Sequence, residues 1–243
     1  MLESDPEGWT DVSPGTRLEG WTEYPWFGTE GEQWRHVNQW RLDPATGILQ
    51  CDGHKQGHTM FLRNDEYADF IYHVEWRFAA IRGKRAGYNS GVLVRMLPEM
   101  TSHKVMYQVE TGSTPDHVGW LRGGSLVDGS LTVMNTKVRM GGEWRQVDPG
   151  FPRAWGTHVK AVRSGSDTTG RGNAYDTSID APVNPPGEWN DYEVVCKGKT
   201  ITVWTNGFES SFADNVETLR GRIGLEAEGY PIQFRNLRLK ELA

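Results

Sequence analysis

Apolar and polar residues alternate in short runs along most of the chain, and turn-forming residues separate one run from the next. Alternation with a period of two places successive side chains on opposite faces of a β-strand. The spacing of three and four residues that marks a long amphipathic helix is not sustained along the sequence. The clearest runs predict strands at Phe70–Phe78, Gly91–Arg95, Val105–Glu110, Tyr192–Lys197, Thr200–Thr205, Ile223–Glu228 and Ile232–Leu239.

Two short turns are predicted. Gly198 and Lys199 join two of these runs directly, and after the Thr200–Thr205 run Asn206 with Gly207 supplies the positive φ that a tight reversal needs. Many short strands without alternating helices predict an all-β sandwich of two sheets. We expect one domain over residues 1–243, with a long irregular loop region at 112–187 that is rich in Gly, Pro, Asp and Ser.

The period-two rule also assigns each side chain to a face of its strand. The apolar positions that we expect in the core of the first run are Phe70, Tyr72, Val74, Trp76 and Phe78. The opposite faces of four runs carry polar or ionisable candidates, namely Glu75, Asn89, Arg95, Gln108, Glu110, Glu226 and Glu228. Such a set is typical either of the solvent face of an antiparallel sheet or of a polar binding groove, and the pattern leaves both open.

Composition narrows the class of protein. The 11 Trp, 8 Tyr and 8 Phe can bury enough surface for an ordered core, which excludes a disordered chain. The net charge of −6 argues against a nucleic-acid partner, because such a partner calls for a basic surface. No apolar run approaches the roughly 20 residues that cross a bilayer, so we expect no membrane span.

The cysteines and the N-terminal residues give information about the cellular compartment of the protein. Cys51 and Cys196 are too few for a disulfide framework, and whether they pair is left open. The first residues lack the basic and apolar segments of a signal peptide. We therefore expect a cytoplasmic protein, or a periplasmic or secreted bacterial one if a leader has been removed.

A series of motifs runs in order along residues 8–243. The motifs are Gly8–Thr10, Leu18–Trp21, Trp40–Asp43, Gly47–Leu49, Tyr67–Phe70, Glu75–Arg77, Asn89–Val92 with Arg95, Tyr107–Val109, Gly187–Asn190, Trp204–Gly207, Gly224–Leu225 and Phe234–Leu237. Together they resemble the motifs of the 3-keto-disaccharide hydrolase domain family. The resemblance implies a single jelly-roll sandwich similar to concanavalin A-like lectins and laminarinase-type enzymes, with a sugar on its polar concave sheet. The tryptophans that lie within these motifs are expected in the core, namely Trp9, Trp21, Trp40, Trp76 and Trp189.

The chain departs from this family pattern at several places. The family usually has an acidic residue where Met106 stands, Asp where Thr111 stands, Gln where Glu226 stands and His where Glu228 stands. Residues 112–187 also fit the pattern poorly. The resemblance therefore supports the scaffold more strongly than the substrate.

The chemistry that the resemblance implies is cleavage of glycosides already oxidised to a ketone at C3 of the sugar. The C3 carbonyl acidifies the C2 hydrogen, so that a base can remove it, the C1 aglycone leaves by elimination, and water adds afterwards. The candidate bases are Glu75, Glu110, Glu226 and Glu228, of which Glu226 or Glu228 is favoured. The candidate substrate-binding residues are Asn89, Arg95, Gln108, His103 and Trp120.

Metal ligation is a weaker hypothesis. His54 and His58 follow Cys51 and Asp52 at a spacing that could ligate zinc, but one Cys and two His fall short of a closed structural site. Carboxylates gathered on one face could instead bind a divalent cation. A divalent cation (Ca, Mn or Zn) is thus the candidate cofactor, and no organic cofactor is expected.

Three functions remain open from the sequence, which also leaves the oligomeric state open. The first is an enzyme acting on 3-keto-glycosides, and the second is a lectin-like carbohydrate-binding module without chemistry. The third is an ordinary glycoside hydrolase that uses a pair of glutamates. In each case the partner is a small-molecule or oligosaccharide ligand.

Overall fold

The chain builds a two-layer β-sandwich. In this computed structural model the described residues are 1–2, 4–25, 39–52, 59–81, 88–97, 105–112, 118–127, 130–147, 180–217 and 219–243. Within these ranges the regular elements are strands, and all neighbouring strands pair antiparallel. The predicted all-β sandwich is confirmed. The described residues contain no helix with the length and apolar character that crossing a membrane requires.

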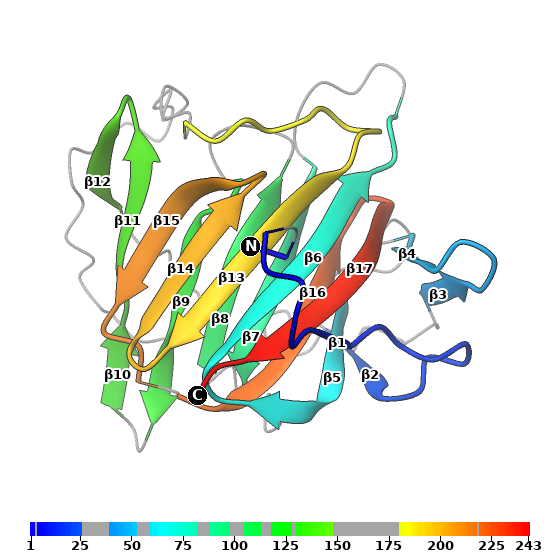
Figure 1. Cartoon of the computed structure of the whole chain (residues 1–243), viewed down its shortest axis with the longest axis horizontal. Coiled ribbons are helices and arrows are strands. Elements are labelled where there is room, and N and C mark those ends of the chain that lie inside the picture. The colour runs from blue at the N-terminus through cyan, green and yellow to red at the C-terminus, as the bar shows by residue number, and fades with distance from the viewer. Residues whose placement is uncertain are drawn as a thin grey trace, which may run out of the picture.

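A ten-stranded sheet faces the viewer in Figure 1. Its strands are Thr10–Asp11 (β1), Trp40–Asp43 (β3), Ile48–Cys51 (β4), Phe70–Phe78 (β6), Asn135–Met140 (β11), Glu143–Val147 (β12), Asn190–Lys197 (β13), Thr200–Thr205 (β14), Phe208–Asp214 (β15) and Ile232–Glu241 (β17). Their order is β12-β11-β15-β14-β13-β6-β17-β4-β3, and β1 pairs with β17.

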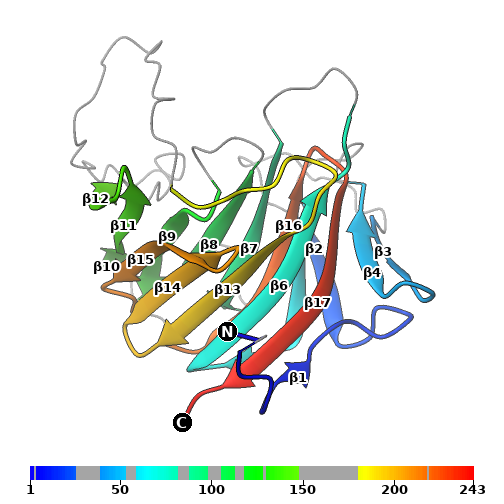
Figure 2. The same cartoon turned by 45° about the horizontal axis from the view of Figure 1, so that its top comes forward.

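A seven-stranded sheet forms the second layer, which lies behind the first in Figure 1 and is seen at an angle in Figure 2. Its strands are Trp21–Pro25 (β2), Thr59–Tyr67 (β5), Asn89–Met96 (β7), Val105–Gly112 (β8), Leu121–Val127 (β9), Ser130–Val133 (β10) and Gly221–Glu228 (β16). Their order is β10-β9-β8-β7-β16-β5-β2, so the chain segments of β7 and β16, far apart in sequence, are direct neighbours.

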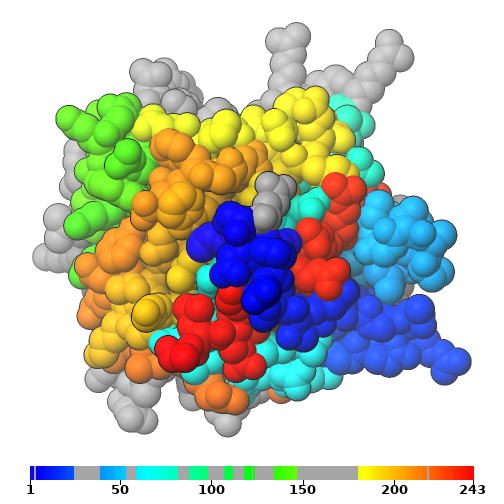
Figure 3. All heavy atoms as spheres, in the orientation of Figure 1, coloured from blue at the N-terminus to red at the C-terminus, as the bar shows by residue number. Residues whose placement is uncertain are grey.

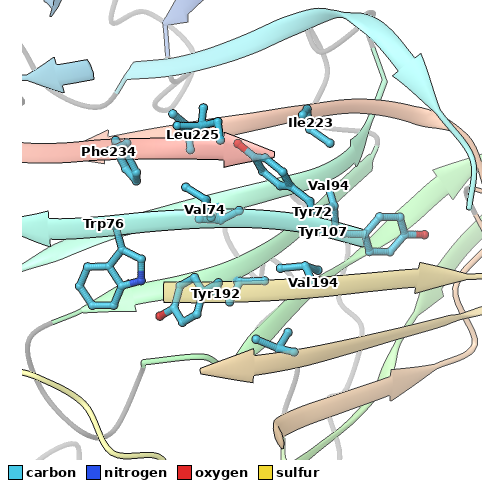
Figure 4. Close-up of a cluster of buried hydrophobic side chains, with 14 of the residues drawn as sticks. Tyr72, Val74, Trp76, Val94, Tyr107, Tyr192, Val194, Ile223, Leu225 and Phe234 are labelled. Atoms are coloured by element: carbon cyan, nitrogen blue, oxygen red, sulfur yellow. The ribbon is translucent and has the colours of Figure 1, made fainter. Parts of the chain in front are cut away.

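The core lies between the two sheets. The five apolar positions of β6 that the alternation assigned to the core are all buried, which confirms that prediction. Figure 4 shows side chains of both sheets in this layer, among them Trp76 and Tyr192 from one sheet and Val94, Tyr107 and Leu225 from the other. Each large apolar side chain that is fully buried stabilises the fold by about 1.5–3 kcal/mol, so this layer positions both sheets.

The region 112–187 contains more regular structure than the sequence predicted. Residues 121–147 form β9, β10, β11 and β12, which extend the two sheets at one end. In β11 the exposed or half-buried members Asn135, Lys137 and Arg139 alternate with buried ones. Strands near the edge of a sheet carry many polar residues, and this polarity made the segment look like a loop.

Two of the tryptophans that we expected in the core lie on the outer face of the ten-stranded sheet. The rings of Trp9 and His73 meet edge to face, and the guanidinium groups of Arg77 and Arg235 lie over the ring of Trp189 at 4.4 and 4.1 Å from its centroid. Figure 3 shows the N-terminal residues lying across this face. By contrast, Trp21, Trp40 and Trp76 are buried as predicted.

The two cysteines are too far apart to form a disulfide with each other. Cys51 lies on β4 and Cys196 on β13, and the order of the sheet puts β6 and β17 between these strands. Both side chains are buried, and burial raises the pKa of the Cys196 thiol to about 12. Neither residue is therefore a reactive thiol of the folded protein.

Candidate functional site

Polar side chains gather on the outer face of the seven-stranded sheet. Leu225 of β16 and Val92 of β7 pair with each other and point into the core. Their sequence neighbours Glu226 and Gly91 also form a pair, and the alternation of strand side chains directs this second pair outward.

The strand register brings the candidate residues into two adjacent rows. One row runs from Glu226 on β16 through Gly91 on β7 to Glu110 on β8. The next row holds Glu228 and Asn89, which lie at or next to the ends of their strands. Three of the four predicted base candidates are thus neighbours on one face, as the sequence led us to expect.

A primary amide holds each glutamate of β16. Gln108 donates from Nε2 to Oε2 of Glu226 at 2.6 Å, and Asn89 donates from Nδ2 to Oε2 of Glu228. A primary amide has two N–H donors, so each amide keeps a second hydrogen for another acceptor. The predicted substrate-binding residues Asn89 and Gln108 therefore also orient the carboxyl groups beside them.

Glu226 is the most buried titratable group of this set, with 1 % of its side chain exposed. Its strand partner on β5 is Met60, and Met60 belongs to an apolar cluster with Leu62, Leu93 and Met96 on the same side of the sheet. Burial, followed by repulsion from Glu228 and Glu110, raises the pKa of Glu226 well above its ordinary value, while Gln108 opposes the rise. Glu226 therefore keeps its proton to higher pH than an exposed glutamate.

The apolar cluster beside Glu226 is a feature that the sequence analysis missed. The alternation placed Leu93 on the polar face, and we expected that face to carry polar or ionisable groups. In the structure Leu93 joins Met60, Leu62 and Met96, all nearly fully buried, and Tyr24 packs against them. The outer face of the seven-stranded sheet thus has a polar half and an apolar half.

Glu75 does not belong to this set, which corrects the prediction that it is a catalytic base. It lies on β6 in the other sheet and faces outward there, so the whole core separates it from Glu226. His73, at 4.0 Å, and hydrogen bonds from Arg235 and Asn236 outweigh burial and lower the pKa of Glu75 to about 2. Glu75 is the charged partner of Arg235, at 2.6 Å, on the outer face of the ten-stranded sheet.

Arg95 is also not placed to bind substrate. Its side chain is 0 % exposed, and its guanidinium group donates to the carbonyl oxygens of Ala68 and Gly198 and pairs with Asp69 at 3.0 Å. These acceptors lie in the turns that end β5 and β13, so Arg95 joins the two sheets at one end of the sandwich. All these contacts are structural.

The remaining candidates divide into two groups. Trp120 is half-buried, packs against the core between the sheets, and accepts a backbone hydrogen bond from Glu110. His54, His58 and His103 lie outside the described residues. Among the residues that are described, no cluster of three or more His, Cys, Asp or Glu is arranged to hold a metal ion.

Comparison with known families agrees with the resemblance that the motifs carry. Residues 8–240 match the model of the 3-keto-alpha-glucoside-1,2-lyase-like domain. The chain belongs to this family. Among curated proteins none matches it in sequence.

Solved structures share the fold of this lyase-like domain at low sequence identity. A candidate glycosyl hydrolase from Parabacteroides distasonis has a TM-score of 0.54 at 18 % identity, covering 100 % of this chain and 98 % of that one. The carbohydrate-binding module CBM66 from Bacillus subtilis has a TM-score of 0.52 at 13 % identity, covering 91 % and 96 %. The beta-glucanase of Bacillus licheniformis has a TM-score of 0.50 at 11 % identity, covering 92 % and 94 %. The fold is thus the concanavalin A-like jelly roll of glucanases and carbohydrate-binding modules.

Proposed function

We propose that this protein cleaves 3-keto-glycosides by removing the C2 proton of the sugar and eliminating the C1 aglycone, with water adding afterwards. One observation carries the proposal beyond family membership. Glu226 and Glu228, two residues apart on β16, face the same side of the sheet, yet one is fully buried and the other is half exposed. Two carboxyl groups in unlike environments can divide the work of an acid and a base.

In the first step Glu228 accepts the C2 proton, and the electrons of the C2–H bond form an enolate with its negative charge on the C3 oxygen. The C3 carbonyl then re-forms as the enolate electrons move into a C1=C2 double bond. The C1–O bond breaks as the aglycone oxygen takes the proton that Glu226 holds. In the second step water attacks C1 while Glu226 takes a proton from it, and Glu228, whose proton exchanges with solvent, donates a proton to C2. Both carboxyl groups end in their starting states, so the cycle needs no further reactant.

Three features of the described residues support these roles. Glu228 is the half-exposed member of the pair at the end of β16, where it is the one that a sugar reaches first. Glu226 has a raised pKa, which suits a group that must hold a proton before it donates one. The second N–H of Asn89, next to Glu228, is a donor for the C3 oxygen as negative charge develops on it.

The test is to offer the purified protein a chromogenic 3-keto-glucoside and its unoxidised parent glucoside, each with and without EDTA. We expect release of the aglycone from the keto compound alone. Release from the parent would show an ordinary glycoside hydrolase and would contradict the proposal. Binding of the parent sugar without release from either compound would show a carbohydrate-binding module instead.

The EDTA arm addresses the divalent cation that the sequence suggested. The steps written above use only side chains of the described residues, and the candidate metal ligands His54 and His58 lie outside those residues. Full activity after EDTA treatment is the expected result for these steps. Loss of activity that returns when Ca, Mn or Zn is added would show that a divalent cation takes part in the reaction.

A further inference from the structure

The hydrogen bond between Gln108 and Glu226 crosses a whole strand. Gln108 lies on β8 and Glu226 on β16, and β7 runs between them in the sheet. Neighbouring strands lie about 4.8 Å apart, so the two backbones are separated by roughly 10 Å. Each side chain therefore has to extend across β7 to bring Nε2 and Oε2 to 2.6 Å.

Gly91 is the residue of β7 that lies under this hydrogen bond, which we call the Gln108–Glu226 bridge. It is the strand partner of Glu226 on one side and of Glu110 on the other. A Cβ atom on residue 91 would lie 2.4 Å from Nε2, 2.7 Å from Cγ and 2.8 Å from Cδ of Gln108. These distances are far below any normal carbon contact, so any side chain here would displace the amide. The φ of Gly91 lies outside the left-handed region, so glycine is needed here for space and not for backbone conformation.

We propose that Gln108 is the positioning residue of Glu226, and that the glycine at position 91 is what allows its amide to reach that carboxyl group. The part that concerns catalysis rests on the proposed function, whereas the bridge itself does not. Gln108 is buried with 4 % of its side chain exposed, so the interaction is shielded from water. Loss of the Gln108 amide would leave the buried carboxyl group of Glu226 without this hydrogen-bond donor.

The groups around Glu226 make this amide the main stabiliser of its charged form. The titratable side chains that face it are Glu228 on its own strand and Glu110 on β8, and both repel a second negative charge. The adjacent strands contribute Gly91 and Asn89 from β7 and Met60 from β5, none of which is titratable. A hydrogen bond to a charged group is among the stronger polar interactions in a protein.

The experiment follows the Glu226 carboxyl group itself by ¹³C NMR titration of protein labelled at glutamate, assigned with Glu226→Gln. Gln108→Met keeps the length of the side chain and removes the donor, and Gly91→Ala removes the space. We expect each to raise the titration midpoint of Glu226 by about one pH unit. Because both act on one bridge, the double variant should show the same shift as either single variant.

Gly15→Ala is the matched control, since a Cβ there would lie 2.3 Å from Oε2 of Glu19 and displace a side chain on the surface. It should leave the Glu226 midpoint unchanged. An unchanged midpoint in Gln108→Met would overturn the proposal, and so would a second, additive shift when Gly91→Ala is combined with it. Should Gly91→Ala fail to fold, Gln108→Met decides alone.

The NMR titration separates this inference from the proposed function. The titration midpoints of Glu226 test the Gln108–Glu226 bridge directly, whether or not the protein cleaves any sugar. If the protein does cleave 3-keto-glycosides, Gln108→Met should also shift the alkaline limb of the pH profile of kcat upward by a similar amount. A uniform loss of activity with an unchanged profile would mean that Gln108 has only a structural role.

Discussion

The two glutamates of β16 differ in their surroundings, not in their own chemistry. Glu226 faces Met60 and lies under the amide of Gln108, and Glu228 is half exposed beside Asn89. Burying a carboxyl group favours its neutral form, because the charged form loses its hydration. A site that keeps such a group therefore gives up stability at high pH.

This cost can be measured with Glu226→Gln. The stability that a raised carboxyl pKa confers is complete below pH 4.5 and is lost as the pH rises through the higher folded-state pKa. We expect Glu226→Gln to be more stable than the natural protein at pH 8, and to have lost turnover. Denaturant unfolding at pH 4 and pH 8 checks this, with the exposed Glu143→Gln as the control. Equal losses of stability for Glu226→Gln at both pH values would contradict it.

Arg95 gives a second prediction at this scale. Its buried guanidinium group satisfies two backbone carbonyls and Asp69, so Arg95→Met leaves these acceptors without their donor. We expect a loss of about 3 kcal/mol in the free energy of unfolding, with sugar binding unchanged. The exposed Arg41→Met, which breaks only the surface pair with Asp52, should lose under about 1 kcal/mol. A weaker affinity for sugar without a loss of stability would return Arg95 to the binding site.

At the scale of a strand, the alternation rule explains both a success and an error in β7. The rule correctly places Ser90, Val92 and Val94 in the interior. It fails at Arg95, because Val94 and Arg95 together oppose Ile223 of β16, and Arg95 has a φ of +50°. Such a bulge adds one residue and reverses the facing of the residues after it. Neither the arginine nor its neighbours signal the bulge in the sequence.

Glu75 shows a second limit of the same rule. Alternation gives the face of a strand on which a residue lies, but it does not give the sheet to which the strand belongs. In both β6 and β16, apolar core residues alternate with residues on the opposite face, which include Glu75 in β6 and Glu226 in β16. Only the pairing of β6 with β13 and β17 puts Glu75 on the far side of the molecule. Long-range pairing of this kind is what the local sequence cannot specify.

The turn between β14 and β15 was predicted correctly and offers a test of an element. Asn206 has a φ of +48°, and its side chain accepts from the backbone of Asp191 and donates to Asn190 at 2.8 Å each. Asn206→Ala strains the turn and removes these bonds, so we expect a loss of about 2 kcal/mol. Asn135→Ala removes one exposed bond to Asp214 and should lose much less in the same urea titration. Similar losses of stability in the two variants would mean that the hydrogen bonds of Asn206 do not stabilise the fold.

At the scale of the whole molecule, Glu75 and Glu193 on one outer face and Glu226 on the other respond to pH in opposite directions. On the ten-stranded sheet, burial opposes ionisation of Glu193, but His73 at 3.5 Å, the N-terminal amino group and the backbone N–H of Leu2 outweigh burial and lower the pKa of Glu193 to about 2. The pKa of Glu75 is lowered to about 2 as well. On the seven-stranded sheet, burial and like charge raise the pKa of Glu226. The molecule should therefore lose stability toward acid from one face and toward alkali from the other.

The loss of stability in acid can be traced to the outer face of the ten-stranded sheet. A lowered carboxyl pKa confers stability that is present above pH 4.5 and is lost as the pH falls toward 2. We expect Glu75→Gln to be less stable than the natural protein at pH 7, with a flatter stability curve between pH 4.5 and 2. Urea midpoints across this range test it. A parallel curve with the slope of the natural protein would show that Glu75 does not contribute to acid unfolding.

The sandwich and the outward facing of several polar side chains could be predicted from the sequence for physical reasons. Core alternation and turn chemistry are local, and alternation puts the carboxyl groups at residues 110, 226 and 228 on the outward faces of their strands, which the strand pairing then brings together. The role of Gly91 had a signal, since a glycine inside a strand often marks a close approach of another group. No signal in the sequence predicted the burial of Glu226. That burial depends on Met60 and the apolar neighbours of Met60, which only long-range strand pairing brings next to Glu226.

The most direct measurement is cleavage of a 3-keto-glucoside in D₂O, followed by NMR of the sugar product at C2. Elimination passes the C2 proton to Glu228, and a carboxyl proton exchanges with solvent, so we expect deuterium at C2 of the product. The same product incubated without enzyme gives the background exchange, and Glu228→Gln should abolish both cleavage and deuterium uptake. Product that forms with its original hydrogen at C2 would contradict elimination and point to direct hydrolysis.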